Sequence, residues 1–104
     1  MVLQLVVRCN EFMKTYLITY DLIKPETSAD YVKLFANIKS HLGWAKPMKS
    51  VWFVKTNRSR DEIMQLLRSA GDSNDKFLVI EVTREWIAFN LPANVITWMK
   101  NQIQ

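Results

Sequence analysis

Two segments of this chain, residues 50–56 and 77–82, are apolar on both faces of the β-strands that they predict. Such strands need cover above and below, because apolar surface left against water costs free energy in proportion to its area. Any fold for this chain must therefore bury both faces of its sheet, at least in part.

The other expected elements surround these two strands. Residues 15–22 are rich in β-forming side chains, and residues 44–46 are a shorter strand candidate followed by a turn at 47–49. A helix is expected over residues 29–42, after a cap at Thr27 or Ser28 and before a stop at Gly43. Its apolar stripe comprises Tyr31, Leu34, Phe35, Ile38 and Leu42.

Two further helices complete the pattern. Ser59 and Glu62 have the spacing of a capping box, in which each side chain satisfies a backbone amide near the other residue. The apolar stripe that follows ends at Gly71 and comprises Ile63, Leu66, Leu67 and Ala70. Pro92 is a favoured first residue for a short terminal helix.

The order strand, helix, strand, strand, helix, strand, helix predicts an α+β, ferredoxin-like βαββαβ sandwich with an added C-terminal helix. Both main helices of that arrangement cover one face of an antiparallel sheet. The other face needs the terminal helix, with Trp86 and Trp98, or a second copy of the chain. A homodimer with a closed two-fold axis is the preferred solution.

Length and composition set further limits. A chain of 104 residues with 49% apolar residues predicts one domain, over residues 13–104. Residues 1–12 are expected to be an extension ahead of a natural start at Met13, with an extra edge strand as the rival interpretation. A single Cys excludes a disulfide framework and a cysteine zinc site.

Hydropathy, glycine count and net charge limit the partners and the cellular location that we expect. No apolar run approaches the roughly 18 residues that span a bilayer, so we expect a soluble cytoplasmic protein with no membrane partner. Two glycines cannot build a phosphate-cradling loop, which argues against a nucleotide cofactor. A net charge of +4 permits a phosphate-rich partner but falls short of an electrostatic signature for one.

An ordered set of short motifs between Met13 and about Gln102 resembles a known group of proteins. The set is similar to the SinR family, within the superfamily of the small CRISPR-associated endoribonuclease, which is the spacer-acquisition adaptor, and of virulence-associated protein D. The matching residues are Tyr20-Asp21-Leu22, Lys24-Pro25, Ile38-Lys39-Ser40, Ser50, Trp52, Lys55-Thr56, Asp72-Ser73-Asn74-Asp75 and Glu81-Val82.

This resemblance implies a ferredoxin-like homodimer. In nuclease members, the aspartate that ends the first strand binds a divalent metal at the dimer interface, and Asp21 matches that position. CRISPR-associated members tend to carry an arginine-rich first helix, whereas residues 29–42 offer only Lys33 and Lys39. That departure argues against membership of an acquisition complex.

Asp21 is the candidate catalytic and metal-binding residue. Magnesium or manganese needs few carboxylates, and such an ion can orient a phosphate and stabilise a leaving oxygen. One aspartate per chain becomes a pair only through two-fold symmetry. The structural alternative is that Asp21 ends a strand and accepts hydrogen bonds in the turn before Lys24-Pro25.

Basic residues around the central hairpin are candidate contacts to RNA or DNA: Lys46, Lys49, Lys55, Arg58 and Arg60. Trp44 just before them and Trp52 among them could stack bases. The stronger alternative is structural, with lysines that protect sheet edges and both Trp in the core. His41 is expected at the surface or as a helix cap, and Asp72 and Asp75 as turn residues.

Two functional hypotheses follow. The first is a metal-dependent endoribonuclease-like homodimer that acts on nucleic acid and holds magnesium or manganese between two Asp21 carboxylates. The second is a non-catalytic dimeric scaffold that binds nucleic acid or a protein through the basic hairpin.

Overall fold

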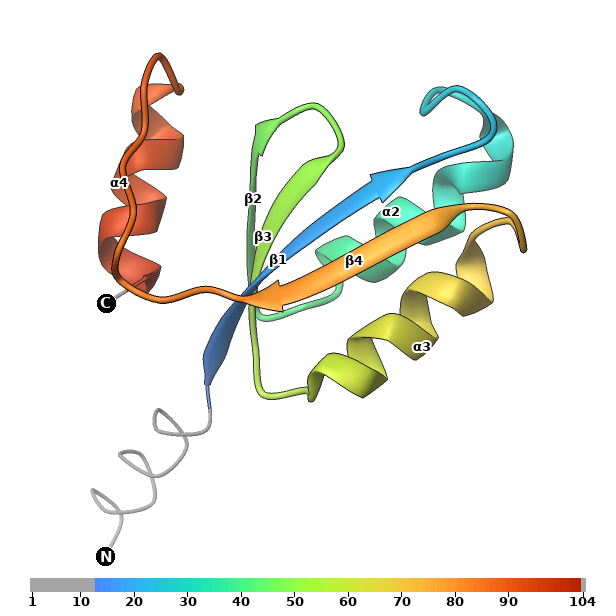
Figure 1. The fold of residues 1–104 in the computed structure, drawn as a ribbon, viewed down its shortest axis with the longest axis horizontal. Coiled ribbons are helices and arrows are strands. Elements are labelled where there is room, and N and C mark those ends of the chain that lie inside the picture. The colour runs from blue at the N-terminus through green and yellow to red at the C-terminus, as the bar shows by residue number, and fades with distance from the viewer. Residues whose placement is uncertain (1–12, 104) are drawn as a thin grey trace, which may run out of the picture.

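The computed structural model describes residues 13–103 as an α+β domain (Figure 1). Its strands are β1 (Lys14–Asp21), β2 (Gly43–Met48), β3 (Val51–Thr56) and β4 (Lys76–Glu81). Its helices are a short 3-10 turn η1 (Ala29–Tyr31), α2 (Val32–Lys39), α3 (Arg60–Ala70) and α4 (Ala93–Gln102). The expected extension over residues 1–12 lies outside the described residues.

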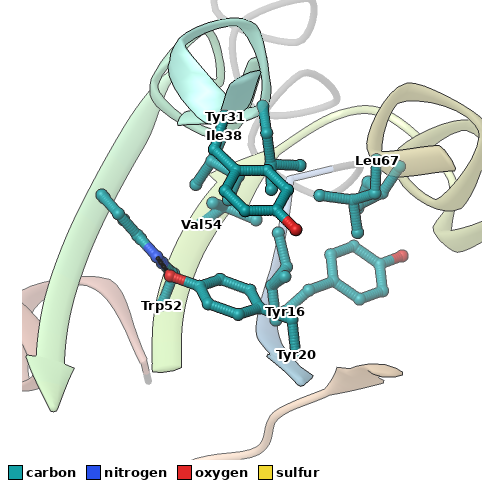
Figure 2. Close-up of a cluster of buried hydrophobic side chains, with 10 residues drawn as sticks. Tyr16, Tyr20, Tyr31, Ile38, Trp52, Val54 and Leu67 are labelled. Atoms are coloured by element: carbon teal, nitrogen blue, oxygen red, sulfur yellow. Dashed lines mark hydrogen bonds between the residues drawn. The ribbon is translucent and has the colours of Figure 1, made fainter. Parts of the chain in front are cut away.

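The four strands form one antiparallel sheet in the order β2-β3-β1-β4. Along β1, Tyr16, Ile18 and Tyr20 point to one face, and the residues between them point to the other. The first face packs against η1, α2 and α3, and this core includes Tyr31, Ile38, Val54 and Leu67 (Figure 2). Two of the three α-helices therefore cover the same side of the sheet.

The second face carries a smaller core. Phe53 packs there against Val95 and Met99 of α4 and against Ile103, which follows the helix, with Leu17 and Trp98 at its margin. Figure 1 shows α4 on the β2 side of the sheet, apart from α2 and α3. Over β3 and part of β1 the cover is thus the terminal helix, which was the alternative to the preferred second copy of the chain.

The rest of the second face stays open. Leu78 and Ile80 of β4 are 51% and 49% exposed, and Met48 of β2 is 54% exposed. Met48, Val51, Thr19 and Leu78 are successive partners across all four strands and so form one row. Helix α4 leaves this row without cover.

One helix boundary differs from the prediction. Helix α2 ends at Lys39, where the N–H and hydroxyl of Ser40 both bond to the carbonyl of Asn37. Leu42, which was expected in the apolar stripe, is 71% exposed, and Gly43 begins β2 rather than ending the helix. The capping box of Ser59 and Glu62 is confirmed, with both reciprocal bonds at 3.1 Å.

Candidate nucleic-acid interface

Asp21 is the last residue of β1 and is exposed to solvent. Its partner across the β1–β4 ladder is Lys76. By strand alternation Asp21 lies on the second face, one row beyond Thr19 and Leu78. The carboxylate therefore stands beside the open row that α4 leaves uncovered.

A hollow of about 450 Å³ lies beside Asp21 at the end of the sheet. Glu26 and Thr27 of the loop after β1 line it, together with Lys49 and Ser50 of the β2–β3 turn. Ser50 has a φ of 59°, which turns the chain sharply between the two strands. Its carbonyl accepts from the Thr19 hydroxyl at 2.8 Å and ties this turn to β1.

A second hollow, of about 420 Å³, lies between α2 and the edge strand β2. Phe35, Trp44 and Trp52 supply its aromatic wall, and Lys39 and Lys46 supply its charge. The two tryptophan rings lie 5.4 Å apart between centroids at an angle of 56°. Lys39 Nζ lies 5.2 Å from the centre of the Trp44 ring, within the range of a cation–π contact.

A hydrogen-bonded chain fixes the wall that the two hollows share. Trp52 Nε1 donates to the Tyr20 hydroxyl at 3.0 Å, a contact visible in Figure 2, and that hydroxyl donates to Glu26 Oε1. Lys46 Nζ donates to the same oxygen at 3.0 Å. The bond from Tyr20, with the bond and charge of Lys46, outweighs burial and holds the pKa of Glu26 below its usual value.

The basic residues expected to act together lie in three places. Lys46 and Lys49 stand beside the two hollows. Lys55 lies on the α4 face of the sheet and donates to the carbonyl of Gln102 at 3.0 Å. Arg58 and Arg60 lie past the other end of β3, where Arg58 contacts Ser40 and His41. Of these five residues only Lys49 lines the hollow beside Asp21, and Lys46 lines the neighbouring one.

His41 is buried, contrary to the expectation of a surface position. Its Nδ1 lies 3.2 Å from the hydroxyl of Thr56 and 3.4 Å from Nη1 of Arg58. Burial, with the charge of Arg58, lowers the pKa of His41 to about 4. Because Arg58 can only donate, Nδ1 accepts and the proton of the neutral ring sits on Nε2.

Asp75 is a turn residue, as expected, and it also connects three segments. Its carboxylate accepts from the N–H of Ile23, the hydroxyl of Tyr31 and the N–H of Asp72, at 2.9, 2.9 and 2.7 Å. Burial alone would raise the pKa of Asp75, but these three bonds hold it below its usual value. The carboxylate is therefore committed to the fold.

Sequence reasoning missed Glu26 and the part that Lys39 plays. Lys39 follows Phe35 by four residues, so helical spacing places both on one face of α2 and could have identified it. No local pattern marks Glu26, because its partners Tyr20 and Lys46 come from two different strands. The hollow between α2 and β2 is a long-range feature of the fold.

A metal would find few ligands in one copy of the chain. Within residues 13–103, no group of three or more His, Cys, Asp or Glu side chains is placed to hold an ion. Magnesium keeps several waters and accepts as few as one or two carboxylates, so Asp21 alone is a minimal ligand set. A second copy would supply a second carboxylate.

None of the protein-family models matches this chain, and comparisons with curated proteins and with solved structures also give no match. Within the described part of the chain, no helix has the length and apolar character needed to cross a membrane.

Proposed function

We propose that this chain is a ferredoxin-like member of the superfamily of the CRISPR-associated endoribonuclease and virulence-associated protein D, similar to the SinR family, and cleaves RNA as a metal-dependent homodimer. The strand order β2-β3-β1-β4, with α2 and α3 on one face, supports the ferredoxin-like assignment. For such an activity on cellular RNA, we propose that the protein is located in the cytoplasm.

The observation that carries this proposal is the position of Asp21 beside the open row. Met48, Val51 and Leu78 leave apolar surface on this part of the sheet, and burying it against a second copy would stabilise a dimer. A two-fold axis near the row would bring the two Asp21 residues toward each other. Two carboxylates at that place form the minimal protein part of a magnesium or manganese site.

Asp21 and Lys49 have separate roles in this proposal. Asp21 from each protomer holds the ion, and Lys49 supplies positive charge to RNA phosphate in the hollow next to it. When bound, magnesium or manganese supplies the charge that draws a phosphate group to the two-fold axis.

The test is cleavage of labelled single-stranded RNA and duplex DNA with magnesium, manganese or a chelator. Wild-type protein is expected to cut in a metal-dependent manner, and Asp21→Asn to fold and dimerise but not to cut. Asp61→Asn is the matched control, since Asp61 lies exposed in the first turn of α3. Equal cutting by Asp21→Asn and wild type would disprove a role for Asp21.

A non-catalytic dimeric scaffold is the second candidate, and it is favoured because no three metal-ligating side chains gather within residues 13–103. In this case Lys46 and Lys49 bind nucleic acid or a protein partner and no bond is broken. Lys49→Glu is then expected to weaken RNA retention at low salt, while Asp21→Asn leaves it unchanged. If wild-type protein retards neither RNA nor DNA at low salt, the nucleic-acid form of this scaffold is excluded.

A further inference from the structure

The hollow at Asp21 and the hollow at Trp44 adjoin each other. Glu26 and Thr27 line both, so the loop after β1 is their common wall. A chain-like ligand that entered at Trp44 could continue past Glu26 to Lys49 and Asp21. The two hollows together form a groove along one end of the sheet.

Trp44 gives this groove a surface on which a flat ring can stack. It is 41% exposed on the edge strand β2, whereas Trp52 beneath it is 4% exposed and bonded to Tyr20. Phe35 stacks on Trp52 at 6.1 Å and an angle of 25°, which supports the buried ring. An exposed indole held on a packed aromatic base is the platform that proteins use for unpaired nucleobases.

The charges around Trp44 suit a phosphate. Lys39 Nζ lies 5.2 Å from the Trp44 ring, and Lys46 Nζ lies 5.3 Å from the Trp52 ring. The one acidic residue of the hollow, Glu26, already accepts from Tyr20 and Lys46. Lys46 thereby balances the negative charge of Glu26. Lys39 is then the cation of this hollow that can contact the phosphate next to a base bound on Trp44.

We propose that the hollow between α2 and β2 binds one unpaired nucleobase on Trp44 and the adjoining phosphate at Lys39, so that the substrate is single-stranded RNA. This inference rests on the proposed function, because it supplies a subsite beside Asp21. Bases inside a duplex are stacked and paired and cannot reach the indole face. Duplexes are therefore poor ligands of this groove.

The first experiment measures binding with a chelator present, so that it does not depend on cleavage. Fluorescence anisotropy follows a short labelled RNA, either single-stranded or annealed to its complement, with wild type, Trp44→Ala and Trp44→Phe. Trp44→Ala is expected to weaken single-strand binding by about tenfold or more, and Trp44→Phe to keep most of the affinity. Circular dichroism checks that each variant folds.

Phe89→Ala is the matched control, because Phe89 is 93% exposed and lies outside both hollows. It is expected to bind as wild type does. The inference is overturned if Trp44→Ala keeps wild-type affinity, or if the duplex binds as tightly as the single strand.

A second measurement isolates the phosphate contact. The slope of the logarithm of affinity against the logarithm of salt concentration is expected to shrink by about 0.7 in Lys39→Ala, the value for one single-strand phosphate contact. Lys100→Ala removes the same charge at an exposed position of α4 and should leave the slope unchanged. Equal slopes in Lys39→Ala and wild type would contradict a phosphate at this position.

The outcomes for this subsite and for the nuclease are separable. Binding that depends on Trp44 in a protein that never cuts RNA would refute the nuclease and support the subsite. Cutting that depends on Asp21, together with unchanged binding by Trp44→Ala, would support the nuclease and refute the subsite.

Discussion

His41 shows how one buried side chain ties stability to pH. Its ring lies under the end of β3 against Thr56, and burial lowers its pKa to about 4 from the usual 6.5. Between these two values the unfolded chain binds a proton that the folded chain does not. The contribution of His41 to the free energy of unfolding is therefore fully present above pH 6.5 and is lost as the pH drops toward 4.

We expect the free energy of unfolding to fall by about 1 to 2 kcal/mol between pH 7 and pH 5. Urea unfolding at these two pH values measures the difference in the free energy of unfolding. The carboxyls of Glu26 and Asp75 have lowered pKa values and lose their contributions only at lower pH, so this window isolates His41. In His41→Gln the difference should disappear, and its persistence would assign the effect to another group.

At the scale of the element, the reciprocal bonds of Ser59 and Glu62 begin α3. Ser59→Ala removes the acceptor for the Glu62 N–H and should lower the free energy of unfolding by about 1 kcal/mol. Glu62→Gln keeps an acceptor for the Ser59 N–H and should cost much less. A loss of the same size in both variants would show that the negative charge of Glu62 contributes as much as the bond to the Ser59 hydroxyl.

Helix α4 packs through Met99, which is 4% exposed against Phe53. Met99→Ala should lower the free energy of unfolding by about 2 to 4 kcal/mol, because it leaves a cavity between α4 and the sheet. Asn101→Ala, at an exposed position of the same helix, is the control. Equal urea midpoints for Met99→Ala and wild type would show that α4 unfolds independently of the sheet.

The elements could be predicted from the sequence because local patterns determine them. Strand β1 and helix α3 were expected within a residue or two of their bounds, from alternation and from the capping box. The helix at residues 29–42 was expected too long, since Ser40 ends it through bonds to Asn37 that an apolar stripe cannot reveal. Boundaries depend on such single contacts.

The candidate site could be predicted only in part. Asp21, Lys46 and Lys49 were identified, and the structure places them along one groove with Trp44. Lys55 pairs with Thr15 at the start of β1, and Arg58 follows that end of β3, so both lie at the other end of the sheet from Asp21. The burial of His41 and the role of Glu26 depend on contacts between distant segments, which no local pattern encodes.

At the scale of the whole molecule, the open row predicts a self-association surface. Leu78→Glu places a charge in the row and is expected to shift sedimentation from dimer to monomer. Val32→Glu, at an exposed position of α2 on the other side of the sheet, should leave the dimer intact. Dissociation by Val32→Glu alone would place the interface on the helical face.

The proposed paired site also predicts a link between dimerisation and activity. A Leu78→Glu variant that is monomeric should lose metal-dependent RNA cleavage even though Asp21 is unchanged, because it offers the ion only one of the two proposed carboxylates. Cleavage by a monomer at the wild-type rate would show that one copy carries a complete site.

The stoichiometry of manganese binding tests the central claim most directly. Titration of the purified protein, followed by the electron paramagnetic resonance of free manganese, counts the bound ions per chain. A site shared across the two-fold axis predicts one ion for every two chains, lost in Asp21→Asn and kept in Asp61→Asn. One ion for every chain, or binding that survives Asp21→Asn, would contradict the paired aspartate site.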